Sequence, residues 1–414
     1  MRNPGFLWVM IGIMAVLDFY VFQAIKVVAS SSPKIRLTIF IAYWVLAGLS
    51  LAVLILLPYI NYDNWPRAVR TYFFAIVVGL FFSQLVASLF LLVDDIRRGC
   101  MWIIGKLFSN PSVPINESAE GITRSTFMSW LGLAAGGGLF GTLIYGFNNK
   151  YRYQVNRVKL TYNNLPKSFK GIKIIHISDI HSGSFMDKQA VQKGVDKIVK
   201  EKADLILFTG DLVNDRSTEM KDYMDVFNQL KAPLGVYSTL GNHDYGDYVR
   251  WDSREAKTAN LERLKQVHGE LGWRLLMNEH VVLEKNGEQI ALLGIENWSS
   301  KGRFPKYGKM KEAYPGTEKY PFKILMSHDP SHWEGEVLSI YKDIDLMLAG
   351  HTHGMQFGLE LPGFKWSPVQ YVYKQWAGLY ESKAQKLYVN RGFGFIGYPG
   401  RVGILPEITV IELV

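Results

Sequence analysis

The chain of 414 residues is long enough for two or three domains, and 48% of its residues are hydrophobic, which is high for a soluble enzyme. The formal net charge is +9, but no helix-turn-helix, finger or RNA-binding signature accompanies it, so we expect no nucleic-acid partner. Anionic lipid head groups account for the basic charge at least as well. The single cysteine, Cys100, excludes an intrachain disulfide and a thiolate metal cluster.

Four apolar segments near the N-terminus are long enough to cross a bilayer, which takes about 20 residues each. They cover about residues 6–25, 37–60, 71–93 and 127–147. The second and third contain no charged residue, whereas Asp18 lies within the first. A carboxylate in lipid is costly, and we expect Asp18 to be neutral or paired inside a helix bundle. The longest connection between segments covers residues 94–126.

The chain becomes polar from Asn148, which places a domain boundary near residue 150. We predict a transmembrane region with about four helices over residues 1–150 and a second domain over 151–414. Four spans put the N-terminus and the second domain on the same side of an inner or plasma membrane.

Lys and Arg residues near the spans favour neither orientation, with seven on each side. Without the four that precede the long second domain the count becomes seven against three, which favours an extracytoplasmic second domain. The stretch TRSTFMSWLGLAAGGG resembles a degenerate twin-arginine export signal, and an ordinary helix with a basic flank explains it equally well.

Five short apolar runs after residue 150 each end in Asp, Asn or His, and such runs predict buried strands. The polar residues that follow them are Asp179 and His181, Asp211, Asn242 with His243 and Asp244, His328, and finally His351 and His353. Side chains just past the carboxyl ends of neighbouring strands converge on one crevice. Carboxylate and amide oxygens together with imidazoles predict a mixed oxygen and nitrogen site for divalent metal ions.

The order of these motifs, D-x-H, G-D, G-N-H-D, a lone His and G-H-x-H, resembles the calcineurin-like metallophosphoesterase superfamily. The C-terminal RGFGFIGYPGRVGILPEITVIEL is also similar to the closing segment of the membrane-linked bacterial branch of that superfamily. The resemblance covers roughly residues 155 to 414. It implies an α/β fold of the αββα sandwich type, in which two mixed sheets pack face to face with helices outside.

The resemblance also implies roles for single residues. The first of two divalent metal ions takes Asp179, His181 and His353, the second takes Asn242, His328 and His351, and Asp211 bridges them. The metals can be Mn, Fe, Zn or Mg, since such sites accept each of them. His243 contacts the phosphate or protonates the leaving oxygen, with Asp244 orienting it. Arg391 matches a position where relatives place an arginine close to the metals, so it is either a phosphate contact or an ordinary surface arginine.

These features predict a membrane-anchored metal phosphohydrolase that acts on a phosphomonoester, a phosphodiester or a pyrophosphate, with lipid-linked phosphates among the candidates. A non-catalytic metal-binding scaffold is an alternative that predicts missing ligands, and none is missing. A transporter or sensor with an accessory phosphoesterase domain is a second alternative, and the few charges within the spans argue against it. The aromatic segment between Gly354 and Tyr388 is either a lipid-facing lip beside the site or a loop packed on the domain's own core.

Overall fold

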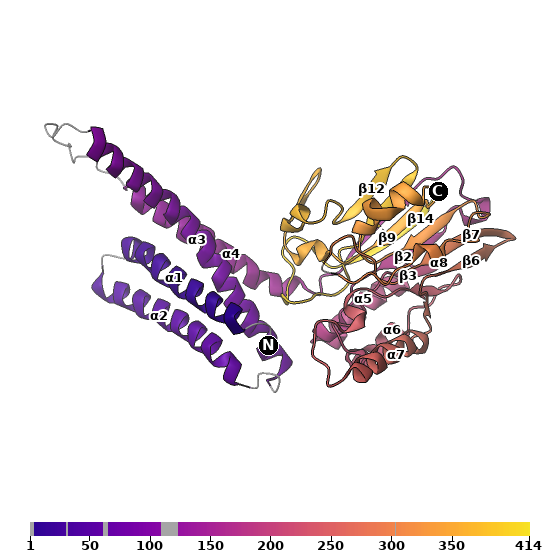
Figure 1. Ribbon diagram of the computed structural model, residues 1–414, viewed down its shortest axis with the longest axis horizontal. Helices are drawn as coiled ribbons and strands as arrows, with labels where there is room; N and C mark the ends of the chain where they lie inside the picture. Colours follow the sequence, from indigo (N-terminus) through magenta and orange to yellow (C-terminus); the bar gives the residue numbers. More distant parts are fainter. Residues whose placement is uncertain (1–3, 30–31, 61–64, 109–122, 303) are drawn as a thin grey trace. The chain divides into compact units, whose positions relative to one another are not determined.

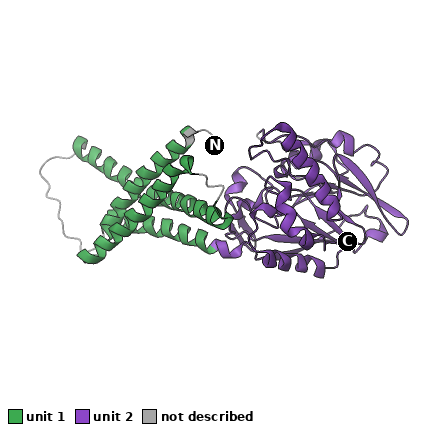
Figure 2. Ribbon diagram, turned by 90° about the horizontal axis from the view of Figure 1, so that it is seen from below, with its two compact units in different colours: residues 1–145 green, residues 146–414 purple. Residues whose placement is uncertain are grey.

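The structure, a computed structural model, describes residues 4–29, 32–60, 65–108, 123–302 and 304–414. It divides into two units, Met1–Tyr145 and Gly146–Val414 (Figure 2). The domain boundary that we propose near residue 150 lies close to this division.

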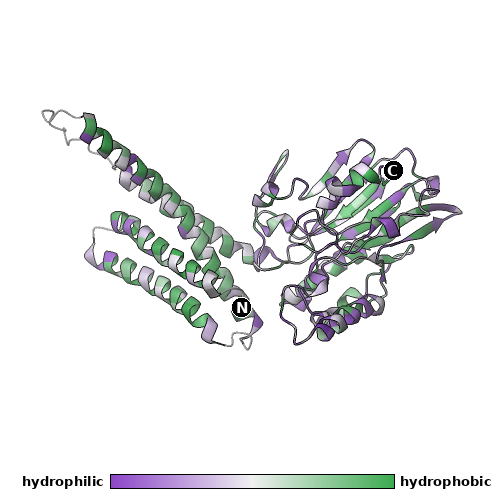
Figure 3. Ribbon diagram, in the orientation of Figure 1, coloured by the Kyte–Doolittle hydropathy of each residue, from purple (hydrophilic) through white to green (hydrophobic). Residues whose placement is uncertain are grey.

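The first unit is helical, as the four apolar segments predict. Its helices are α1 (Pro4–Val28), α2 (Pro33–Leu56), α3 (Arg67–Phe108) and α4 (Arg124–Gly146). All four are long and apolar enough to cross a membrane, and Figure 3 shows how hydrophobic residues dominate them. Asp18 is buried, and the Gln84 side chain donates a hydrogen bond to its carboxylate.

Helix α3 is longer than its apolar segment. It continues through residues 94–108, which the sequence suggested as part of a connection, and residues 109–122 lie outside the described part of the chain. Asp94 forms ion pairs with Arg97 at 2.8 Å and Arg98 at 3.3 Å. Pairs spaced three and four residues apart stabilise a helix, which explains why α3 does not end with its apolar residues.

The second unit contains two six-stranded sheets and a hairpin (Figure 1). The first sheet has the order β1 (Gln154–Leu160), β14 (Glu407–Leu413), β2 (Lys173–Ile177), β3 (Leu205–Phe208), β4 (Val236–Ser238), β5 (Arg274–Leu275). The second has the order β12 (Gly378–Ser382), β13 (Gln385–Val389), β9 (Leu346–Ala349), β8 (Lys323–Met326), β7 (Glu288–Gly294), β6 (Glu279–Lys285). The hairpin pairs β10 (Leu359–Leu361) with β11 (Phe364–Trp366).

Both sheets are mixed. Strands β2, β3 and β4 run parallel, with β14 antiparallel to β2. Strands β7, β8 and β9 also run parallel, with β6 antiparallel to β7. The parallel strands at the centre of each sheet therefore end at a common edge, which is the condition for residues after different strands to meet.

Alternating side chains of the central strands build two layers of core. Ile174 of β2 and Leu207 of β3 pack against Ile324 of β8 between the sheets. The intervening residues, such as Ile175 and Phe208, pack on the other face against helices α5 (Lys188–Lys200), α6 (Met224–Phe227) and α7 (Arg254–Glu270). Strands buried on both faces are expected where helices cover a sheet.

Short helices cover the outer face of the second sheet. Helices α8 (Met310–Ala313) and α9 (Leu338–Ile340) and the π-helical turn Trp333–Val337 lie here, and Met310, Trp333 and Val337 pack with Leu325 and Met347. The layers are therefore helix, sheet, sheet, helix, which confirms the predicted αββα sandwich.

Candidate metal centre

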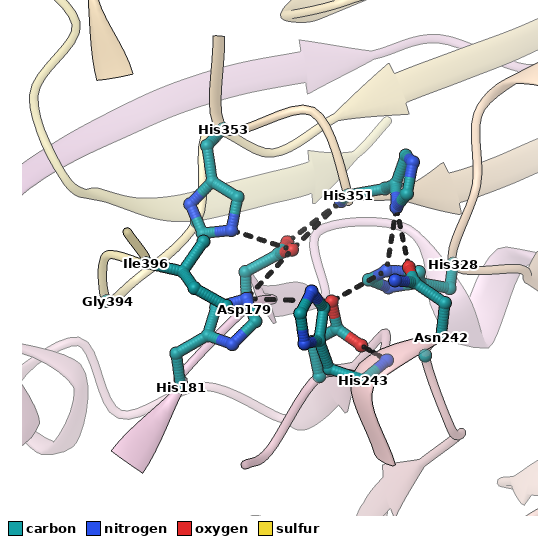
Figure 4. A network of polar contacts seen from close by, with 12 residues as sticks. Asp179, His181, Asn242, His243, His328, His351, His353, Gly394 and Ile396 are labelled. Atoms are coloured by element: carbon teal, nitrogen blue, oxygen red, sulfur yellow. Dashed lines mark hydrogen bonds and ion pairs between the residues drawn. The ribbon is translucent and has the colours of Figure 1, made fainter. Parts of the chain in front are cut away.

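The five predicted polar clusters meet at the carboxyl edges of the two sheets. Asp179 and His181 follow β2, Asp211 follows β3, and Asn242 and His243 follow β4. His328 follows β8, and His351 and His353 follow β9. Figure 4 shows the labelled Asp, Asn and His side chains of these clusters pointing toward one another. The first sheet and the second sheet thus each contribute to a single site.

Five of these residues lie on strained backbone. Asp179, His181, Asp211, His351 and His353 have positive φ angles between 48° and 69°. Side-chain-bearing residues rarely adopt this left-handed conformation, and such strain is concentrated at functional sites. Tight packing of the loops holds it in place, because a Cβ atom on Gly210 would collide with the backbone of Gly241.

Asp179, His181 and His353 form what we call the first ligand group. One potential ligand atom from each lies within 4.8 Å of the others, and all three residues are buried. Nε2 of His353 lies 3.2 Å from Oδ1 of Asp179. Among the described residues, both ring nitrogens of His181 lack a hydrogen-bond partner, and Nε2 of His353 meets the Asp179 carboxylate without hydrogen-bond geometry. A buried polar atom without a partner is costly, and a metal ion would supply the missing partner.

Asp211, His328 and His351 form the second ligand group, with Asn242 beside them. Nε2 of His328 lies 3.1 Å from Oδ2 of Asp211 and 3.3 Å from Nδ1 of His351. Nδ1 of His351 also lies 2.8 Å from Oδ1 of Asn242. Two nitrogens and two oxygens from four loops therefore converge on one point, which is the donor set of a divalent cation site.

The carboxylate of Asp211 faces both groups. Its Oδ2 lies 3.1 Å from His328 and 3.5 Å from Nε2 of His181 in the first group. Burial opposes ionisation, but the imidazoles of His328 and His243 hold the pKa of the Asp211 carboxyl well below its usual range. Burial likewise opposes protonation of His328, yet the Asp211 carboxylate raises the pKa of that imidazole to about 10. The Asp211 carboxylate therefore favours a positive charge beside it on the side of the second ligand group.

Outer contacts fix which nitrogen of each imidazole faces the site. Nδ1 of His328 lies 2.8 Å from the Thr209 carbonyl oxygen, so Nε2 points inward. Nε2 of His351 lies 2.9 Å from the Tyr373 hydroxyl, which donates to Asp329, so Nδ1 points inward. Such contacts to the second ring nitrogen are usual for histidines that bind metals.

His243 lies beside both groups, but its partner differs from the prediction. Its Nδ1 lies 2.8 Å from the carbonyl oxygen of Asn214, and its ring lies 4.3 Å from the exposed ring of Tyr248. The carboxylate of Asp244 instead accepts backbone N–H bonds from Gly241 and from Asp211 and the two residues after it. The structure therefore gives no support to the orienting role predicted for Asp244, whose carboxylate holds the Asp211 loop.

Arg391 is also placed differently from the prediction. Nη1 of Arg391 lies 2.6 Å from Glu407, and Nε and Nη2 donate to Glu360. The pKa of Glu407 is lowered to about 2 because Arg391 and other donors outweigh its burial. The two carboxylates engage three nitrogens of this guanidinium, so the structure gives no support to Arg391 as a phosphate contact.

A second arginine, Arg401, lies against the first ligand group and was not singled out by sequence. Its side chain is fully buried, and Nη2 lies 3.2 Å from Nδ1 of His353. Nη1 donates to the carbonyl oxygens of His353 and Arg391 at 3.2 and 2.8 Å. Burial lowers the pKa of Arg401 to about 9, so the guanidinium is still charged at neutral pH. The only sequence signal was its place in the C-terminal segment that resembles the membrane-linked branch.

Comparisons with known proteins show which family this chain is similar to. Residues 172–355 match the family described as calcineurin-like phosphoesterase, and residues 1–150 match a family described as probable calcineurin-like phosphoesterase, transmembrane domain. A transmembrane protein with metallophosphoesterase domain from Danio rerio is 29% identical over 342 residues, which are 81% of this chain and 73% of that protein. Phosphodiesterase YaeI from Escherichia coli is 28% identical over 249 residues, 58% of this chain and 82% of that protein. An uncharacterized metallophosphoesterase of Bacillus subtilis, YkuE, is 28% identical over 254 residues, 60% and 81% of the two chains.

Proposed function

Because this chain belongs to the calcineurin-like metallophosphoesterases that carry a four-helix transmembrane domain, we propose that it hydrolyses a phosphoester or pyrophosphate at a membrane surface with two divalent metal ions. The observation that carries the proposal is the pair of ligand groups on either side of the Asp211 carboxylate. Two-metal hydrolases hold two ions side by side, and a carboxylate that faces both ligand groups suits such an arrangement.

The residues present fit the ions that the family implies. Asp179, His181 and His353 would hold one ion, Asn242, His328 and His351 would hold the other, and Asp211 would be shared. Mn, Fe, Zn and Mg all fit a set of oxygen and nitrogen donors. Such ions polarise phosphoryl oxygens and lower the pKa of bound water when they are present.

His243 is the residue that we propose for proton transfer. Its backbone N–H donates to Oδ1 of Asp211 at 2.8 Å, and the Asn214 carbonyl holds Nδ1, so Nε2 is left for the substrate. The side chain is only part-buried, unlike those of the first ligand group. A leaving oxygen held beside the shared carboxylate would lie within reach of this nitrogen, which is the position that a general acid requires.

Two finer points belong to the same proposal. We propose that the substrate is lipid-linked, since a domain joined to four spans meets membrane phosphates at high local concentration. We also propose that the domain lies outside the cytoplasm, since the count of Lys and Arg favours that orientation. A membrane-impermeant maleimide applied to intact cells should label Ile340→Cys in a Cys100→Ser background, and labelling only after lysis would reverse the orientation.

The central experiment uses the purified full-length protein. After metals are removed with a chelator, each of Mn, Fe, Zn and Mg is restored and hydrolysis of bis(p-nitrophenyl) phosphate, p-nitrophenyl phosphate and nucleotide pyrophosphates is measured. We expect activity to return as two metal equivalents bind per chain. Full metal content without hydrolysis of any ester or pyrophosphate, lipid-linked ones included, would favour the non-catalytic scaffold.

A further inference from the structure

The second unit carries an exposed apolar surface beside the metal centre. Ten of its large hydrophobic side chains are exposed among the described residues, and six of these lie within residues 355–372. We call these six the apolar lip: Met355, Leu359, Leu361, Phe364, Tyr371 and Val372, which are 45% to 77% exposed. The other four are scattered over different elements. Scattered apolar residues are normal on a surface, whereas a cluster of this kind marks an interaction site.

The lip has regular secondary structure and internal hydrogen bonds, and the hairpin β10–β11 lies at its centre. Leu361 pairs with Phe364 across the hairpin, and Leu359 pairs with Trp366. The indole N–H of Trp366 donates to the Tyr371 hydroxyl at 3.4 Å, which joins the hairpin to the turn Pro368–Tyr371. All of strand β10 is exposed, so the domain's own core does not cover this face.

Arg401 and Val402 connect the start of the lip to the residues that end the last candidate span, Arg124–Asn149. The backbone N–H of Arg401 donates to the Gly146 carbonyl oxygen at 2.9 Å, and the Asn149 side chain donates to the Arg401 carbonyl oxygen at 3.1 Å. The next residue, Val402, pairs with Phe357 as in a parallel sheet. Only one residue, Gly358, separates Phe357 from β10, so the lip begins next to the point where the chain leaves the lipid.

The same segment packs against the loop of metal ligands. The Ser367 hydroxyl donates to the Gly354 carbonyl oxygen at 2.9 Å, and the Thr352 hydroxyl donates to the Trp376 carbonyl oxygen at 2.6 Å. Met355 itself lies two residues after the ligand His353. Anything that the lip contacts therefore also lies close to the metal centre.

We infer that the apolar lip inserts into the bilayer that α4 spans and places the metal centre at the level of the lipid phosphates. Side chains at the end of a span lie among head groups, where aromatic residues are favoured and exposed Leu, Phe and Val reach the acyl chains. The exposed Arg152, just after the span, suits anionic head groups. The inference that the lip inserts into the membrane depends only on these residues. The inference that it brings a lipid phosphoester to the metals also rests on the proposed function.

The insertion is tested with the full-length protein in vesicles of phosphatidylcholine and phosphatidylglycerol. In a Cys100→Ser background, Phe364→Cys carries an environment-sensitive fluorophore, and Ile340→Cys is the matched control because Ile340 is equally apolar and 62% exposed on a different element. We expect a blue shift and quenching by brominated acyl chains at position 364 only. Equal exposure of both probes to aqueous iodide would overturn the inference. A probe at 364 that is shielded from iodide but not quenched by brominated lipid would also overturn it, and would indicate that a second copy or another protein covers the lip.

Activity provides the second readout. The double variant Leu361→Glu, Phe364→Glu should hydrolyse soluble bis(p-nitrophenyl) phosphate at the wild-type rate and lose most of its hydrolysis of a phosphatidic acid embedded in vesicles, whereas Ile340→Glu should change neither. If the wild-type protein cleaves no phosphoester, the proposed function fails while the quenching result still decides the inference about the lip. If lip variants and control cleave the vesicle substrate equally well, the lip does not deliver substrate.

Discussion

The two ligand groups differ in the charged side chain that lies next to them. The first group lies beside a buried arginine, and the second lies beside a buried aspartate. The guanidinium of Arg401 lies 3.2 Å from Nδ1 of His353. In the second group, the carboxylate of Asp329 lies 3.6 Å from Nε2 of His351 and accepts a hydrogen bond from Tyr373. A buried positive charge weakens the attraction of nearby ligands for a metal ion, and a buried negative charge strengthens it. We therefore expect the two ions to be held unequally, with the second more tightly bound.

Replacing the shared carboxylate should abolish the difference between the groups. Asp211→Asn removes the charge that faces both, so we expect loss of both metals and a fall in activity of about 10³-fold or more, as for other preorganised charged groups. Metal content by plasma mass spectrometry and a soluble phosphodiester assay measure this. The circular dichroism spectrum should stay close to wild type, because the residue follows β3 at the edge of the sheet. Near-full metal content would show that Asp211 is not a shared ligand.

His243 provides the next largest effect, because it belongs to neither group. His243→Ala should lower turnover by about 10²–10⁴-fold, the usual contribution of a general acid, while both metals stay bound. His351→Ala is the comparison variant and should lose the second metal. If His243→Ala loses as much metal as His351→Ala, His243 is itself a ligand. The hypothesis of two ligand groups with a separate general acid would then be wrong.

The charge of Asp329 can be removed with little change of shape. Asp329→Asn should weaken the second metal by about 10–100-fold, as for other outer-shell partners of metal-bound histidines, and leave the first metal unchanged. Asp343→Asn is a suitable control because Asp343 also accepts a hydrogen bond from a tyrosine, Tyr314, away from the site. Stepwise titration of the metal-free protein by calorimetry distinguishes the sites. Equal weakening of both steps would contradict the assigned difference.

The smallest effect concerns Asn149, whose side chain donates to the Arg401 carbonyl oxygen. Asn149→Ala should lower the free energy of unfolding by about 1 kcal/mol, the usual contribution of one hydrogen bond, and disturb only the metal next to Arg401. Asn164→Ala removes comparable bonds, to Pro321 and Asp345, at a distance from the ligand groups. Chemical denaturation and metal titration of both variants make the comparison. A change in the second metal instead would argue against a link through Arg401.

The sequence predicted what depends on local pattern. The apolar runs of β2 and β3, followed by Asp179 and Asp211, were enough to predict buried strands and the meeting of the residues after them, whereas the sandwich was implied by the family resemblance. Apolar length was enough for the four spans. The length of α3 was not predicted, because it depends on ion pairs made by Asp94 beyond the apolar segment.

The hydrogen-bond partners that distant loops supply to the site residues could not be predicted from the sequence. The carbonyl of Asn214 holds His243, and a backbone carbonyl has no sequence signature. Glu360, in the hairpin, engages Arg391, and its position depends on how that hairpin folds back. Arg401 lies 48 residues from His353 in the chain and carries no motif of its own, so only the folded structure brings the two together.

Five of the proposed ligand residues have a left-handed backbone, so the residue type that is best for stability at these positions differs from the one that is needed for activity. Glycine is the residue that adopts this conformation without strain, and each side chain there costs the fold on the order of 1 kcal/mol. Replacing a ligand such as Asp179 by glycine would relieve that strain while destroying the metal site. Random mutation screened for thermal tolerance alone should therefore enrich inactive chains with glycine at these positions. Relatives that have lost catalysis would be expected to drift in the same direction.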